Sequence, residues 1–368
     1  MKDHTDMSAE FNVDALMPAE MAQKAEAVGV KKANMATLPM LGLAILAGAF
    51  ISAGAIFATT VGAGTADVPF GLAKFAVGLS FTLGLILVIV GGAELFTGNN
   101  LIVMAFTSGK VTFAQLMRNW GIVYLGNFLG SIGTALLMFV SAQYTFGKGA
   151  VGLAALNTAN AKCGLGFFQA IALGIMCNAL VCMAVWLCFS ARSTTDKILA
   201  IIPPISAFVA AGFEHSIANM YFIPMGLFIK AWGSPAFFES IGKTAADFSN
   251  LTWGNFFLAN LLPVTIGNII GGAVMVGQQQ RQVHGRTRRR ERHCPHPKIL
   301  DPRQAGRVPV CIGGQHDLGA ALEGLGADVV GVADDELRAI SCLAQHIRTA
   351  TDTDEHRLVL LDEGLERA

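Results

Sequence analysis

Hydrophobic residues in this chain gather into six long runs separated by short polar segments. A helix that crosses a lipid bilayer needs about 20 predominantly apolar residues, because each residue adds about 1.5 Å of rise. Each run is long enough for one crossing, so the pattern predicts an all-α membrane protein with six transmembrane helices. The runs occupy residues 37–62, 70–107, 113–142, 166–190, 196–230 and 252–277.

Polar residues interrupt the second and the fifth run near their middle. The second run contains GGAELFTGNN at residues 91–100, and the fifth contains GFEHSIAN at residues 212–219. Neither apolar arm of the fifth run is long enough to cross a bilayer alone. Ionisable residues within a membrane are costly and rare, and they usually mark a transport pathway. We therefore predict two broken helices, with a conduction site around His215.

The two interruptions match each other. A Gly-x-Glu sequence followed by Asn has the same spacing at residues 92–99 and 212–219. The third and sixth runs match as well, with GNFLG at residues 126–130 and GNIIG at residues 267–271. This order predicts a repeat of three helices, and because three is odd, the second copy enters the membrane from the opposite side. Inverted repeats with matching interruptions place a binding site where the repeats meet. Chance similarity among glycine-rich runs is the alternative.

The composition supports a membrane protein. Hydrophobic residues make up 53% of the chain and charged residues only 14%, whereas soluble domains carry about 25% charged residues. Of the seven cysteines, four lie in or beside the fourth run, and none forms a CxxC pair. Buried apolar positions are therefore expected for them rather than disulfides or zinc ligands. We expect no metal and no cofactor.

Residues 1–36 are predicted to form a cytoplasmic N-terminal region with an amphipathic helix at residues 10–35. Pro18 suits a first helical position, and apolar residues recur at helical spacing behind it. We expect this helix to lie on the membrane surface, with a part in gating as the alternative. Positive charge favours the cytoplasmic side. With the N-terminus inside, that side receives Lys24, Lys31, Lys32, Lys110, Arg118, Arg192 and Lys197.

A broken helix suits a small anion. Half-helix N-termini offer unpaired N–H groups and positive dipole ends, which attract an anion without trapping it on a fixed cation. His215 adds a group that donates a hydrogen bond or a proton. In water, moving a proton from imidazolium to a carboxylate costs roughly 3 kcal/mol. Burial disfavours both charged forms, so a dry site reduces or reverses this cost. Helix packing is the alternative role for a lone membrane histidine.

Four segments of the chain resemble known sequence motifs. In order they are IVGGAELFTG at 89–98, GIMCNALVC at 174–182, GFEHSIANM at 212–220 and PVTIGNIIGG at 263–272. They resemble the motifs of the formate/nitrite transporter family, most closely its bacterial formate channels. The resemblance covers about residues 10–277. It implies an aquaporin-like protomer of six helices in a bacterial cytoplasmic (inner) membrane, with both termini cytoplasmic, and a homopentamer with one pore per protomer.

The resemblance also implies roles for single residues. Thr97 faces His215 across the pore and holds the substrate or the histidine by hydrogen bonding, with a loop cap as the alternative. Lys162, in an outer loop before the fourth run, matches a lysine that draws anions to the pore mouth; a solvated charge is the alternative. Apolar constrictions that exclude hydrated ions are expected at Phe81, Leu85, Leu95, Phe96 and Phe208. Ordinary helix packing is the alternative for these residues. Asn178 and Val181 are expected near the pore wall.

The two glutamates require a separate explanation. Two carboxylates inside an anion pore would repel the substrate. We therefore expect Glu94 and Glu214 to turn away from the pore and accept backbone N–H groups of the broken segments. Four asparagines are expected to satisfy freed backbone groups in the same way, namely Asn99, Asn127, Asn219 and Asn268.

Residues 278–368 form a basic and then mixed tail that has no counterpart in the family. We expect a solvated cytoplasmic segment of unknown or foreign origin, with contact to anionic lipid or nucleic acid as the alternative for the basic run. The segments at residues 308–347 suggest alternating short strands and helices. The spacing of four candidate metal ligands fits no zinc pattern well; these are His284, His293, Cys294 and His296.

Together these observations predict that the chain transports formate, with proton exchange at His215 and pH gating, and that it is not an enzyme. Nitrite or another small monoanion is the near alternative, because both anions are small and planar. A pore for neutral solutes such as water or glycerol is the second hypothesis. An enzyme or sensor, resting only on the tail, is the third. The expected partners are the monoanion, protons, the lipid bilayer and further copies of the chain, but no nucleic acid.

Overall fold

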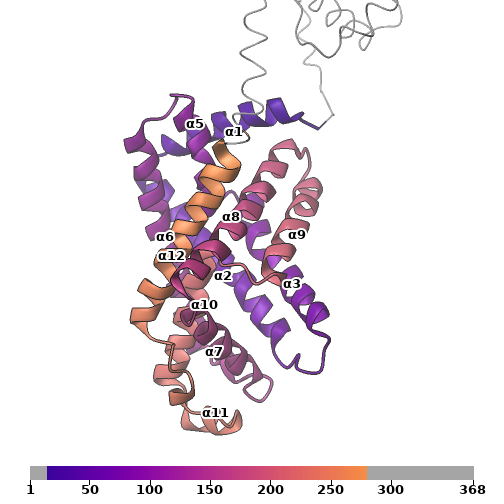
Figure 1. Cartoon of the computed structure of the whole chain (residues 1–368), viewed down its shortest axis with the longest axis vertical. Coiled ribbons are helices and arrows are strands. Elements are labelled where there is room, and N and C mark those ends of the chain that lie inside the picture. The colour runs from indigo at the N-terminus through magenta and orange to yellow at the C-terminus, as the bar shows by residue number, and fades with distance from the viewer. Residues whose placement is uncertain (1–14, 279, 281–368) are drawn as a thin grey trace, which may run out of the picture. The chain divides into compact units, whose positions relative to one another are not determined.

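The computed structural model describes residues 15–278 and residue 280, and within them every regular element is a helix. Figure 1 shows α1 and α5 at one end of this region and α11 at the other. In chain order the helices are α1 (Pro18–Ala33), α2 (Thr37–Gly62), α3 (Phe70–Gly91), α4 (Phe96–Asn99), α5 (Val103–Thr107), α6 (Phe113–Val140), α7 (Ala150–Cys163), α8 (Phe167–Ser190), α9 (Thr194–Ala210), α10 (Ser216–Trp232), α11 (Pro235–Ser240) and α12 (Leu262–Ile269).

Five helices of the described region are long and apolar enough to cross a bilayer. They are α2, α3, α6, α8 and the continuous helix Asn255–Gln278, which includes α12 between two π-helical ends. The fifth predicted run is divided into α9 and α10, of 17 residues each, with extended backbone between them. The prediction of a polar interruption there is confirmed, and so is the interruption after α3.

Both interruptions begin at a glycine. Gly92 follows α3 and Gly212 follows α9, and each has a φ of 74°. This left-handed conformation is disfavoured for residues with a Cβ atom but open to glycine. The chain leaves the helix there, runs extended, and re-enters helical structure at Phe96 or at Ser216. The sequence pattern therefore reflects a backbone requirement for glycine at both positions.

The long helices pack closely because glycines line their contacts. α2 packs on α3 and α6, α3 packs on α9, and α8 packs on α12. A Cβ atom placed on Gly130 of α6 would stand 1.9 Å from the Ile45 carbonyl oxygen, and one on Gly271 would stand 2.1 Å from the Ile175 carbonyl oxygen. Small residues allow membrane helices to approach in this way. The matching GNFLG and GNIIG sequences thus serve equivalent helix contacts.

Replacing Gly130 by alanine is expected to destabilise the protein by at least about 1–3 kcal/mol, because α2 and α6 must separate to relieve the overlap. Gly133 provides a matched control in the same helix, since a Cβ atom placed on it would have nothing within 4 Å. Gly133→Ala is expected to be neutral or slightly stabilising. Thermal unfolding of both variants in detergent tests this, and equal midpoints would contradict the close contact.

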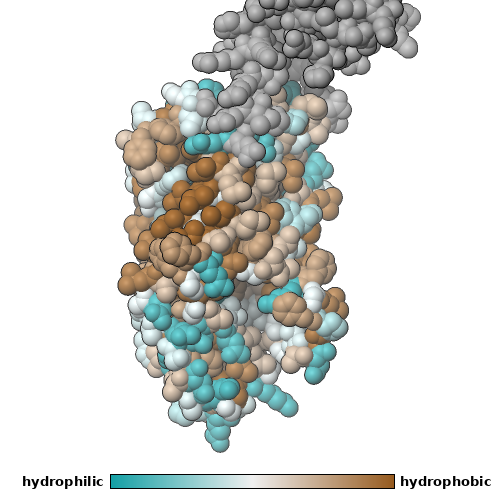
Figure 2. Space-filling model, viewed as in Figure 1, coloured by the Kyte–Doolittle hydropathy of each residue, from teal (hydrophilic) through white to brown (hydrophobic). Residues whose placement is uncertain are grey.

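Apolar side chains cover much of the surface of the described region. Figure 2 shows an apolar area over the upper and middle parts of one face and polar residues toward the lower end. Large apolar side chains on the surface include Leu38, Leu137 and Phe168, which are 80%, 68% and 82% exposed. Soluble proteins rarely expose contiguous apolar area on this scale. A hydrocarbon environment or further protein therefore covers this surface.

The N-terminal helix was predicted at residues 10–35, and the structure places α1 at Pro18–Ala33, with Pro18 at its first turn. Its apolar face packs on α5 and α8 of the same chain. The sequence pattern did not predict α7 or α11. The predictions for residues 281–368, including the basic run, the alternating elements and the four candidate metal ligands, lie outside the described residues.

Candidate functional site

The two helix breaks bring one side chain each into direct contact. Thr97 lies in α4, directly after the first break, and His215 is the N-cap residue of α10, directly after the second. The Thr97 Oγ1 and His215 Nε2 atoms are 3.0 Å apart. Both side chains are buried, with exposed fractions of 0% and 3%. The pairing implied by the family resemblance is therefore present in the structure.

A backbone hydrogen bond determines which nitrogen of His215 carries the proton. The Ala218 N–H group donates to His215 Nδ1 at 3.0 Å. Because a backbone N–H can only donate, Nδ1 must be unprotonated in this arrangement. A neutral imidazole then carries its proton on Nε2 and donates it to Thr97 Oγ1. The Thr97 hydroxyl hydrogen thus remains available to point toward a ligand.

A small apolar cavity of about 10 Å³ adjoins this pair, which is hardly enough for one water molecule. The Phe208 ring stacks on the His215 ring at a centroid distance of 6.0 Å. Six predicted site residues line the cavity, and Ile51 and Ile205, which sequence reasoning missed, complete its wall. The predicted lining residues are Phe81, Leu85, Leu95, Val181, Phe208 and His215.

Two further predicted pore residues lie beside the cavity rather than in its wall. Phe96 packs edge-on against Trp120 and Tyr124, at centroid distances of 5.9 and 4.9 Å. Asn178 donates to the backbone oxygens of Thr97 and Asn268. Asn178 therefore holds the two halves of the site together. Its predicted place near the pore wall stays a prediction.

The two glutamates accept hydrogen bonds from lysine and asparagine side chains, so the expectation that they bind backbone N–H groups is wrong. Glu94 Oε1 lies 2.7 Å from Lys32 Nζ, and Glu214 Oε1 lies 2.7 Å from Lys162 Nζ. Both carboxylates are almost completely buried. A buried carboxylate needs a compensating charge, and backbone donors alone do not supply one.

Asn99 and Asn219 also differ from expectation, because each donates to the neighbouring carboxylate instead of pairing freed backbone groups. Asn99 Nδ2 lies 2.7 Å from Glu94 Oε2, and Asn219 Nδ2 lies 2.6 Å from Glu214 Oε2. The second acceptors of these two amides were not recognised from the sequence. They are the Oδ1 atoms of Asn119 and Asn260, at 2.9 and 2.7 Å.

Asn127 and Asn268 do satisfy freed backbone groups, as predicted. Asn127 accepts the Phe96 N–H and donates to the Glu94 carbonyl oxygen, both at 2.9 Å. Asn268 accepts the Ser216 N–H at 2.9 Å and donates to the Glu214 carbonyl oxygen at 3.0 Å. The expectation of unpaired N–H groups at the start of α10 is therefore wrong for Ser216 and Ala218, which already have partners.

Lys162 lies in the last turn of α7 rather than in a loop. Its ammonium group pairs with Glu214 and stands 5.6 Å from the centroid of the Phe222 ring. Lys32 occupies the equivalent place at the end of α1. The sequence already contained a signal for this correspondence, since each lysine precedes a long apolar run by a few residues. The similar positions of the two lysines could be interpreted only after the structure showed that each one pairs with a glutamate.

Helices that break within a membrane must find partners for their backbone groups inside the protein, and here the breaks meet around a buried polar pair. This arrangement defines a membrane transport protein. The family model described as formate/nitrite transporter matches residues 19–279. The chain belongs to the formate/nitrite transporter family.

Individual relatives agree with this assignment. The formate channel FocA of Escherichia coli (strain K12) is 48% identical over 271 residues, which cover 74% of this chain and 95% of the relative. The formate channel FocA of Haemophilus influenzae is 42% identical over 267 residues, covering 73% and 94%. A solved structure described as a pentameric formate channel with formate bound matches with a TM-score of 0.65 and 44% identity, covering 67% of this chain and 97% of that one.

Proposed function

We propose that this chain transports formate across the cytoplasmic membrane of a bacterium, through a pore in each protomer. The observation that carries the proposal is the Thr97–His215 contact, which joins two helix breaks beside an apolar cavity. The relatives named formate channels favour formate as the substrate over nitrite or another monoanion. The apolar wall excludes hydrated ions because they cannot shed water there.

Proton exchange at His215 is part of the proposal. Formate in the cavity accepts a hydrogen bond from Thr97 or from His215 Nε2. An imidazolium carries protons on both nitrogens, so charging His215 requires its ring to leave the Ala218 N–H group. The charged ring then passes one proton to formate, giving neutral imidazole and formic acid. Neutral formic acid crosses the apolar constriction more readily than the anion.

An inverted repeat with six crossings and cytoplasmic termini is the proposed architecture. The duplicated polar contacts support it, because three kinds of bond at the first break have equivalents at the second. The lysine–glutamate, asparagine–glutamate and asparagine–backbone contacts all recur in the same order. A homopentamer fits the solved relative described as pentameric and the exposed apolar surface.

Gating by pH is proposed through α1. Lys32 of α1 bonds to both Glu94 and Asn99 of the first break, at 2.7 and 3.0 Å. A movement of α1 therefore acts directly on the segment that carries Thr97. Residues 278–368, of which all but the first two lie beyond the matched family region, are proposed to be a separate cytoplasmic tail.

Radiolabelled formate uptake into proteoliposomes tests the function. We expect saturable uptake that unlabelled formate abolishes, and no accelerated swelling with glycerol. Fast glycerol swelling without formate uptake would instead identify a neutral-solute pore. Stronger competition by nitrite than by formate would identify nitrite as the preferred substrate.

A further inference from the structure

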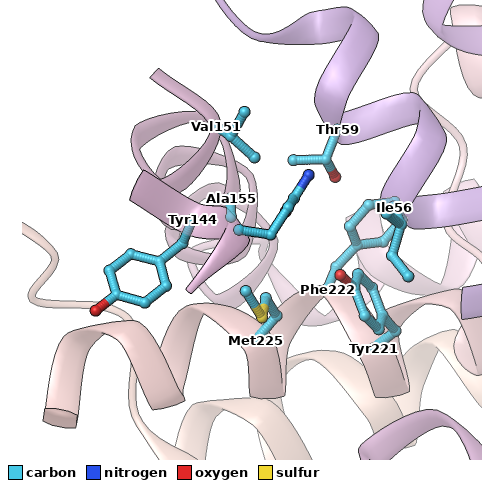
Figure 3. A pocket seen from close by; sticks show the side chains of 9 residues that line it. Ile56, Thr59, Tyr144, Val151, Ala155, Tyr221, Phe222 and Met225 are labelled. Carbon is cyan, nitrogen blue, oxygen red and sulfur yellow. The ribbon is translucent and has the colours of Figure 1, made fainter. Parts of the chain in front are cut away.

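A second small cavity, also of about 10 Å³, lies among α2, α7 and α10. Its wall includes Thr59, Gln143, Tyr144, Tyr221, Phe222 and Met225. Figure 3 shows the hydroxyl end of Tyr221 directed toward the space between these side chains, whereas the Tyr144 hydroxyl points away from it. The cavity is separate from the one beside His215, since the two have no lining residue in common.

The Tyr221 hydroxyl makes no hydrogen bond with any of the described residues, although the residue is only 3% exposed. A hydroxyl that borders a cavity and has no partner there can donate a hydrogen bond to a group that enters the cavity. The donor groups of two neighbouring side chains already have acceptors. The Thr59 hydroxyl donates to the Ala55 carbonyl oxygen at 2.8 Å, and Gln143 Nε2 donates to Thr60 Oγ1 at 3.1 Å. The Tyr221 hydroxyl is therefore free to donate a hydrogen bond to a ligand in the cavity.

Aromatic contacts connect this cavity to the central site. The Phe222 ring stacks on Phe81 with a centroid distance of 6.3 Å and an interplanar angle of 21°. Phe81 lines the cavity beside His215 and meets Phe208 edge-on at 5.7 Å. A ligand at Tyr221 is thus separated from the His215 site by the Phe81–Phe222 pair. The Lys162 ammonium group also lies near Phe222, but it is paired with Glu214, so the two together add no net charge on this side.

We propose that this cavity is a staging site for a small carboxylate, in which the Tyr221 hydroxyl donates a hydrogen bond to a carboxylate oxygen. The inference rests on the proposed function and extends it to a second binding position. A single hydroxyl donor holds the anion without a fixed cation, so the ligand can leave. The present volume of about 10 Å³ is hardly enough for one water molecule, so Phe222 or Met225 must move to admit formate. The carboxylate then passes the Phe81–Phe222 pair to reach Thr97 and His215.

Tyr221→Phe in the full chain tests the staging site, because it removes one hydroxyl and keeps the ring. The half-saturating formate concentration for uptake into proteoliposomes is expected to rise about three- to tenfold. The maximum uptake rate should change little, since Thr97 and His215 are intact. Tyr144→Phe is the matched control: the same substitution in the same wall, at a hydroxyl that points away. We expect wild-type values for this control.

Infrared difference spectra of the wild-type protein, with and without formate, give a second measurement. A formate-induced shift of the phenol C–O band is expected in the wild type and in Tyr144→Phe, and its loss in Tyr221→Phe. If wild-type protein transports formate but Tyr221→Phe has the same half-saturation and the same difference spectrum, the staging site is refuted and the proposed function stands. If both tyrosine variants change equally, the specific role of Tyr221 is refuted. Wild-type protein that takes up no formate refutes the proposed function itself.

Discussion

His215→Asn is expected to lower formate uptake into proteoliposomes by at least about 100-fold, the usual loss when a positioned acid–base group is removed. Asparagine is a good N-cap residue, so its side chain can still accept the Ala218 N–H and preserve the start of α10. What disappears is the Nε2–H group that reaches Thr97 and any proton carried by the ring. The variant therefore separates the chemistry of the imidazole from the structure of the break.

The pH profile gives this prediction a second readout. Wild-type uptake should rise as the external pH falls from about 8 to 5, because the proposed exchange takes up one proton for each formate that leaves His215 as formic acid. The residual flux of His215→Asn should be flat over the same range. Thr97→Ser serves as the control, because it keeps the hydroxyl that accepts from His215. A His215→Asn protein with full, pH-dependent uptake would show that the histidine only packs.

Lys162→Met is expected to destabilise the protein by about 3–5 kcal/mol, since it leaves the buried carboxylate of Glu214 without its counter-ion. Asn219 and Asn260 still donate to Oε2 of this carboxylate, but neither carries a charge. Thermal unfolding of the detergent-solubilised protein measures the loss. The double variant Lys162→Met with Glu214→Gln should recover part of it, because no unpaired charge remains.

Lys110 provides the comparison for this prediction. It pairs with Glu26, but its side chain is 50% exposed, against 16% for Lys162. Solvent screens such a pair, and its removal usually changes stability by less than about 1 kcal/mol. Lys110→Met should therefore unfold close to the wild-type temperature. Equal losses in the two methionine variants would mean that Lys162 contributes packing along its chain rather than charge.

The sequence predicted the interruptions well because their causes are local. Gly92 and Gly212 end helices through their own backbone conformation, and a polar stretch in an apolar run is visible without a structure. The Thr97–His215 pair came from family resemblance, since 118 residues separate the two in the chain. Nothing in the local sequence joins them.

The errors at the site have one common origin. Glu94 and Glu214 were assigned backbone donors because their true partners are distant in sequence, with separations of 62 residues to Lys32 and 52 to Lys162. The helix that carries Lys162, α7, was itself not predicted. Because the glutamates accept from lysines and asparagines, the backbone N–H groups of the breaks donate to Asn127 and Asn268 instead.

By itself, the sequence determined that the chain enters a membrane, where its long apolar helices run and where the chain breaks between helices. These properties depend on the length of apolar runs and on single glycines, which act within a few residues. Only the tertiary structure decided which polar groups meet. A membrane supplies no water to satisfy a buried carboxylate or a freed N–H group, so each must find its partner on another helix. Helix packing determines which partner each group finds, and this cannot be inferred from the spacing of residues along the chain.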